Sequence, residues 1–169
     1  MTSLGEALDE LNSKLSKSNG FMAEPSGSRA PAIILLSDGE PTDDYTHALD
    51  KIKGNPWYKV AVKVAIAVGD DANKSVLADF TGNIESVITV HNVDQLKRII
   101  HTVSVTASQV ASQGSSGVSS SSAPSVPVDV NDQAVNTINN TISSDPTLNG
   151  VDVGSSSTNS GTDDWGGNW

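Results

Sequence analysis

The residues with the clearest chemical potential follow a short apolar run. Ala-Ile-Ile-Leu-Leu over residues 32–36 leads into Ser-Asp-Gly-Glu-Pro-Thr-Asp over residues 37–43. The run is bounded by turn residues, which predicts a central parallel strand buried on both faces. Asp38 then stands at the carboxyl end of that strand, where open α/β sheets bind ligands, and Gly39 allows a sharp turn there. Carboxylate oxygens suit Mg²⁺ or Mn²⁺, so Asp38 is a candidate metal ligand.

A second candidate ligand is the hydroxyl of Thr2, in the segment Thr-Ser-Leu-Gly-Glu-Ala-Leu over residues 2–8. This hydroxyl stands at the expected N-terminus of a helix that enters the same edge of the sheet. The helix dipole disfavours a cation at this end, so nearby carboxylates have to outweigh it. A plain role for Thr2 or Ser3 as the N-cap of that helix is an equally open interpretation.

The same residues have simpler structural interpretations. Asp38 and its glycine neighbour could form only a strand-ending turn. Asp43 and Asp44 are expected to start the following helix favourably through its dipole, with a metal role as the lesser alternative. Asp70 and Asp71 are expected to lie in a solvated loop. The histidines are scattered, without metal-ligand or catalytic-triad spacing, so no catalytic role is predicted for any of them: His47, His91 and His101.

The elements that must position these side chains can be predicted from the spacing of apolar residues. Amphipathic patterns predict helices and continuous apolar runs predict strands, with a Gly-Asn-Pro stop at residues 54–56. The helices are expected over 4–15, 45–53, 74–80 and 93–110, and the strands over 32–36, 60–68 and 86–90. This alternation predicts an α/β fold with parallel strands and flanking helices.

Composition excludes several classes of function. The chain has 169 residues, a net charge of −10 and no cysteine. Its acidic balance argues against binding to nucleic acid or to an anionic membrane, and the missing thiols exclude disulfides and thiolate zinc sites. The N-terminus has no basic and apolar signal pattern, and no apolar stretch is long enough to span a membrane. A cytoplasmic location is therefore expected.

The character of the chain changes near residue 111. All Lys and Arg residues precede Gln113, and the segments 114–125 and 154–169 are rich in Ser, Gly, Asn or Asp. Residues 131–142 carry a weak helical stripe, but Asn and Thr fill its other positions. We therefore expect an acidic disordered tail over 111–169. Its terminal Trp165 and Trp169 could be a short docking motif or an end without function.

Taken in order, these segments resemble the second half of a von Willebrand factor A (vWA) domain. The resemblance rests on Thr-Ser-Leu-Gly-x-Ala-Leu at 2–8, Ser-Asp-Gly-x-Pro-Thr-Asp at 37–43, Val-Ala-Ile-Ala-Val-Gly at 64–69, and the closing pattern up to His101. It is closest in style to bacterial cytoplasmic vWA proteins of the tellurite-resistance TerY type. It implies a vWA domain over residues 1–110 with a partial Rossmann-like sheet. Partners resembling kinases or phosphatases of tellurite-response systems follow from the same likeness.

Members of that family hold a divalent metal in a metal-ion-dependent adhesion site (MIDAS). Carried over, its Thr and Asp ligands are Thr2 and Asp38, the metal is Mg²⁺ or Mn²⁺, and an acidic side chain of a partner protein completes the shell. The family's Asp-x-Ser-x-Ser motif, which precedes the Thr, has no counterpart here. The resemblance therefore implies an N-terminally incomplete domain with a partial site, and the chain alone is expected to bind no metal.

The function expected from the resemblance is protein binding rather than catalysis. One alternative is a non-functional or split-domain fragment that lacks the Asp-x-Ser-x-Ser ligands. A less favoured alternative is a Mg²⁺-dependent hydrolase using Asp38, for which we find no second acid–base or nucleophile motif. In an incomplete sheet the strand carrying Asp38 has an unpaired edge, so association through that edge is also expected.

Overall fold

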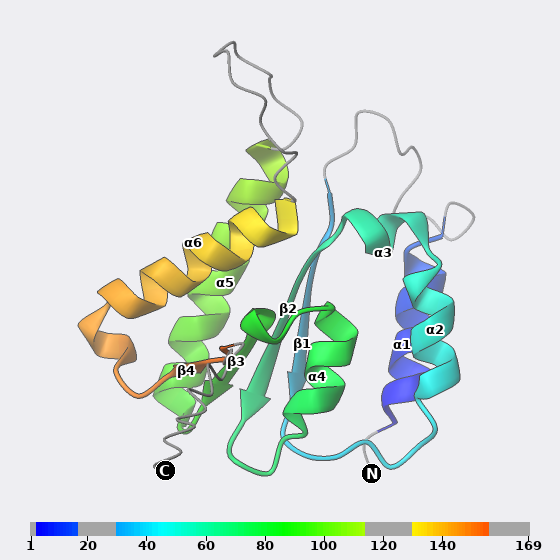
Figure 1. Ribbon diagram of the computed structural model, residues 1–169, viewed down its shortest axis with the longest axis horizontal. Coiled ribbons are helices and arrows are strands. Elements are labelled where there is room, and N and C mark those ends of the chain that lie inside the picture. The colour runs from blue at the N-terminus through cyan, green and yellow to red at the C-terminus, as the bar shows by residue number, and fades with distance from the viewer. Residues whose placement is uncertain (1–2, 17–29, 114–129, 156–169) are drawn as a thin grey trace, which may run out of the picture.

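The computed structural model describes residues 3–16, 30–113 and 130–155. Its strands are β1 (Ala32–Ser37), β2 (Val62–Val68), β3 (Val87–Val90) and β4 (Asp152–Val153). They form one sheet in the order β1-β2-β3-β4, in which the first three strands are parallel and β4 is antiparallel to β3. Helices pack on both faces (Figure 1), which confirms the expected α/β class and mainly parallel sheet.

The helices cover the two faces of the sheet in separate groups. One face carries α1 (Leu4–Lys14), α2 (Thr46–Lys53), α3 (Pro56–Val60) and α4 (Lys74–Thr81), and the other carries α5 (Val93–Gln113) and α6 (Val130–Ser144). Two short 3-10 turns, η2 (Ile84–Ser86) and η3 (Pro146–Leu148), precede β3 and β4.

Burial of apolar side chains holds these layers together. On the first face Leu8 of α1 and Ile52 of α2 pack in one cluster with Ile33 of β1. On the second face Ile99 of α5 and Ile138 of α6 pack in one cluster with the strand residues Val64, Ile66 and Ile88. The first six residues of β2 are all buried, as expected for a strand covered on both faces.

One helix was not expected from the sequence. The Gly-Asn-Pro segment at 54–56 ends α2, but it also starts α3, because the side chain of Asn55 accepts a hydrogen bond from Trp57 N at 2.9 Å. Pro56 takes the first position of α3, where its missing N–H costs nothing. The strand expected from residue 60 therefore begins only at Val62.

The expected disordered tail is wrong for residues 130–155. α6 crosses α5 (Figure 1), and its residues Val135, Ile138 and Ile142 are buried. The Asn and Thr residues between them weaken helix propensity, but tertiary packing of the apolar stripe outweighs that weakness. The remaining tail residues, including Trp165 and Trp169, lie outside the described residues.

The last described strand is joined closely to the sheet. Gly154 N donates to Val87 O at 2.9 Å, and a Cβ at Gly154 would lie 2.0 Å from Ile84 O. The packed unit therefore does not end at the boundary expected near residue 110, because α5 continues to Gln113 and α6, η3 and β4 belong to the same layers.

Candidate functional site

The candidate site is the loop that follows β1 at the carboxyl edge of the parallel strands. Asp38 begins this loop and is exposed to solvent. The loop turns at once, because Ser37 Oγ donates to Gly39 O at 3.1 Å. Asp38 therefore lies at the edge of the sheet where the sequence predicted it, with its carboxylate open to solvent.

Asp43 ties the loop to α1 rather than to the helix that follows it. Its Oδ1 accepts from Leu4 N at 2.9 Å and its Oδ2 accepts from Gly5 N at 2.7 Å. Two free N–H groups at the start of α1 are thus satisfied by one carboxylate, which also suits the positive end of the helix dipole. The expectation that Asp43 starts the next helix is wrong, whereas Asp44 does accept from Thr46 N, at 3.2 Å.

The N-terminus of α1 also corrects the expected cap. Ser3 occupies the N-cap position, but its side chain makes no capping hydrogen bond. Asp43 takes over this role from a loop 38 to 39 residues away in sequence. Capping signals in a sequence involve residues within one turn of the helix start. A cap supplied by a distant loop therefore could not be predicted from the sequence.

A second tie joins the loop to α4. Asn73 Nδ2 donates to Glu40 Oε1 at 3.1 Å. The same side chain accepts from Ser75 N at 3.1 Å and Val76 N at 3.2 Å, so it is also the N-cap of α4. Asn73 was not singled out in the sequence, although Asn before an apolar helical stripe is a usual capping signal.

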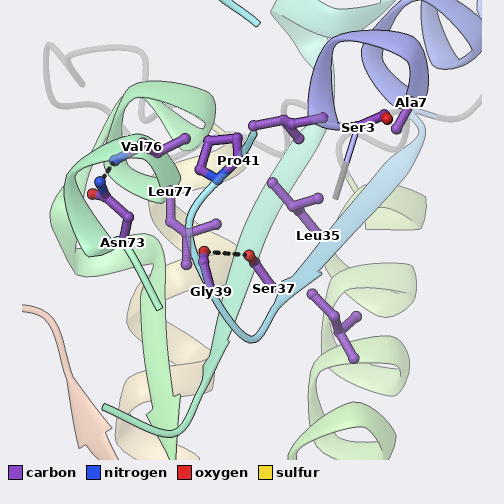
Figure 2. Close-up of a pocket in the computed structure, with 11 residues that line it drawn as sticks. Ser3, Ala7, Leu35, Ser37, Gly39, Pro41, Asn73, Val76 and Leu77 are labelled. Carbon is purple, nitrogen blue, oxygen red and sulfur yellow. Dashed lines mark hydrogen bonds between the residues drawn. The ribbon is translucent and has the colours of Figure 1, made fainter. Parts of the chain in front are cut away.

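Between these ties lies a small pocket of about 110 Å³. Figure 2 shows Pro41 of the loop between Val76 of α4 and Leu35 of β1. Ser3, just before α1, and Ala7 of α1 lie on the side of Pro41 away from α4. The lining is mainly apolar, and its polar atoms come from serine hydroxyls, one asparagine amide and the backbone: Ser3, Leu4, Ala7, Leu35, Leu36, Ser37, Gly39, Pro41, Asn73, Val76 and Leu77.

The two predicted metal ligands are not seen together. Asp38 is described, and Thr2 lies outside the described residues. Among residues 3–16, 30–113 and 130–155, no group of three His, Cys, Asp or Glu side chains could hold a metal ion. Asp43 lies in the same loop, but both its oxygens already accept backbone hydrogen bonds. The described side chains therefore do not fit a metal site by themselves.

One histidine has partners that the sequence did not indicate. His91 Nδ1 lies 3.4 Å from Asp70 Oδ1, and His91 Nε2 lies 3.1 Å from Asp152 Oδ2. Asp70 and Asp71 lie in an exposed loop as expected, with the Asp70 side chain 86% exposed even where it contacts His91. The contact of His91 with Asp152 joins β4 to this edge. His47 and His101 are exposed.

Comparison with known proteins adds no relative. No family model, no curated protein and no solved structure matches the chain. The vWA assignment thus stays a prediction from the residues quoted above. Within the described part of the chain, no helix is both long and apolar enough to cross a membrane.

Proposed function

We propose that this chain is a protein-interaction module of the vWA type, and that its partner docks on the loop after β1. The observation that carries this proposal is the apolar pocket beside the exposed carboxylate of Asp38. Protein interfaces commonly combine a buried apolar anchor with a polar rim. An aliphatic side chain of the partner would fill the pocket, and a basic neighbour would face the acidic rim.

The size of the pocket favours a side chain over a cofactor or substrate. Pockets for small organic ligands are typically about 300–1,000 Å³, and this one is about 110 Å³. Its lining contains no histidine or carboxylate that could act as a general acid or base. Both features support binding of a protein rather than catalysis.

The ties of the loop support the same role. Asp43 holds the loop to α1, Glu40 holds it to α4 through Asn73, and Ser37 closes its first turn. A loop held at three points loses little conformational freedom when a partner binds, so less binding energy is spent on ordering it.

The vWA resemblance adds a metal to this picture, with Thr2 and Asp38 as ligands of Mg²⁺ or Mn²⁺. Since the described side chains do not fit a metal site by themselves, we assign Asp38 a role in the negative charge of the rim. A metal would require further oxygen ligands, including an acidic side chain from the partner.

A selection from a displayed library of random peptides tests the proposal. We expect the enriched peptides to carry an aliphatic residue next to Lys or Arg. Ala7→Phe fills the pocket and should weaken binding of such a peptide about tenfold or more, because burying an apolar side chain contributes about 1.5–3 kcal/mol. Asp38→Asn should weaken it less, and more at low salt than at high salt.

Matched variants serve as controls. Val105→Phe places the same aromatic ring at an exposed helical site on α5, and Asp79→Asn removes an exposed carboxylate on α4. Both should leave binding unchanged. If Ala7→Phe and Val105→Phe bind the peptide equally well, the pocket is not the docking site and the proposal fails.

A further inference from the structure

Among the described strands, β1 forms one edge of the sheet. Val62 N donates to Pro31 O at 2.9 Å, which directs the carbonyl of Pro31 towards β2. Backbone groups alternate in direction along a strand, so the N–H and C=O groups of Ala32, Ile34 and Leu36 point away from β2. No strand in the described part of the chain pairs with these groups, because β1 is an end of the sheet order.

Within the described part of the chain, β1 itself carries none of the residues that usually protect an edge strand against pairing. Natural edge strands carry Lys, Pro, a bulge or an inward charge. The six residues of β1 are Ala-Ile-Ile-Leu-Leu-Ser, paired to β2 in an unbroken register. Ala32 is exposed, and the Leu36 side chain is 44% exposed. The edge therefore offers backbone donors and acceptors beside uncovered apolar side chains.

The charge beside this edge indicates what would pair with it. Three segments at the carboxyl edge of the parallel strands are acidic: the first turn of α1, the loop after β1 and the loop after β2. Their acidic residues are Glu6, Asp38, Glu40, Asp43, Asp44, Asp70 and Asp71. Lys74, on α4, is the next charged residue in the sequence after Asp71. The whole chain carries a net charge of −10, so a second copy would be repelled. A strand with basic residues at the matching end is favoured instead.

We propose that β1 accepts an apolar strand of another protein, parallel to β1 and followed by Lys or Arg residues. Parallel addition continues the pairing of β1 with β2 and places the basic end of the partner beside Ser37 and Asp38. Helices already cover both faces of this sheet, as is usual for parallel sheets. This inference goes beyond docking at the pocket, because the partner strand pairs with the outward backbone groups of β1 and does not need to enter the pocket.

The probe is a short synthetic peptide of alternating valine and isoleucine followed by lysines, added to the whole chain. Amide hydrogen exchange read by NMR gives a signature specific to strand addition. We expect exchange at Ala32, Ile34 and Leu36 to slow when the peptide binds. Exchange at Ile33 and Leu35 should change little, because their N–H groups already point to β2. The same peptide ending in glutamates should bind at least tenfold more weakly.

Ala32 does not line the pocket, whereas Leu36 does, so Ala32→Pro is the variant that separates the edge from the pocket. Ala32→Pro removes an outward N–H at an exposed position where edge strands tolerate proline, and should weaken binding about 3- to 10-fold. Leu36→Lys places a positive charge on β1 near the lysines of the peptide, and the resulting repulsion should abolish the slowing of exchange along β1. Val105→Lys is its control, with 42% exposure on α5, and should bind normally. Ala7→Phe should still bind the probe, so failure of the pocket proposal leaves this one standing.

Three results would overturn the proposal. Uniform slowing of exchange along β1 would indicate general stabilisation and no added strand. Equal or tighter binding of a peptide with its lysines at the N-terminus would exclude the parallel arrangement. Sedimentation that shows a dimer of the native chain, converted to monomer by Leu36→Lys, would identify a second copy as the occupant.

Discussion

At the scale of single residues, the contact between Gly5 and Asp43 is the most constrained feature of the candidate site. A Cβ at Gly5 would lie 2.9 Å from Asp43 Oδ2 and 3.3 Å from Asp44 O. Glycine inside a helix normally destabilises a protein by about 0.5–1 kcal/mol relative to alanine. Here glycine allows the carboxylate to approach the start of α1 closely enough to accept both hydrogen bonds.

We therefore expect Gly5→Ala to destabilise the protein, the opposite of the usual effect of this substitution. Asp43→Ala should cost about 0.5–2 kcal/mol through the lost cap. In the double variant the cost of Gly5→Ala should be smaller, because the carboxylate at 2.9 Å is gone and the contact with Asp44 O at 3.3 Å remains. Unfolding in urea measures all three free energies. Additive costs would show that the two residues do not act through this contact.

Tyr58 gives a prediction for alkaline pH. Its hydroxyl donates to Phe80 O, and burial raises the pKa of this hydroxyl above its ordinary value of 10.0. The folded state then holds the proton more tightly than the unfolded state, so this contribution to stability is complete below pH 10 and is lost as pH rises above it. Tyr58→Phe should lower stability near neutral pH and flatten its fall above pH 10. Thermal melts over a range of pH measure both effects. In the control variant Tyr45→Phe, stability should still fall above pH 10, because Tyr58 is unchanged.

At the scale of elements, α6 completes a strand from the side. β3 pairs with β2 only from Ala65 onward, and at Lys63 the side chain of Asn131 accepts from the backbone N–H at 2.8 Å. The Lys63 Nζ is held by the carbonyls of Tyr58 at 3.1 Å and Ala61 at 3.0 Å. At the amino end of β2, the backbone N–H of Lys63 is therefore bonded to α6, and its side chain is bonded to α3 and to Ala61, which follows that helix.

Asn131→Ala should remove the acceptor for a buried backbone donor, at a cost of about 1–3 kcal/mol. Asn136→Ala, at an exposed position of the same helix, is the matched control and should change stability little. Thermal melts and hydrogen exchange at Lys63 measure the effect. If the two variants are equally stable, Asn131 is dispensable and α6 is held by its apolar face alone.

At the scale of the whole molecule, the sequence predicted the parts with strong periodicity. The three main strands and the helices around Leu8, Leu49, Leu77 and Ile99 could be predicted because each carries an apolar pattern of one period. α6 could be only half predicted: its stripe was visible in the sequence, but its stability comes from α5 and β2. The role of Asp43 could not be predicted, because a carboxylate near a helix start suits two helices equally well until the fold selects one.

For the molecule as a whole, we expect weak or no binding of Mg²⁺. Asp38 is a single exposed carboxylate and both oxygens of Asp43 are engaged, so we expect no saturable heat when Mg²⁺ is titrated to about 1 mM into the chain. Asp38→Ala should give the same trace. A micromolar site that disappears in Asp38→Ala would contradict this expectation and would restore the metal to the proposed function.

The hydrogen bond from Lys63 to Asn131 also has a consequence for synthesis of the protein. It joins residues 68 positions apart, so β2 leaves the ribosome long before its acceptor does. Until α6 has emerged, the nascent chain exposes the apolar face that α6 later covers, with the open edge of β1 beside it. Translation is slower than the collapse of short strands, so we expect β1 and β2 to be accessible during that interval to chaperones that bind extended apolar segments.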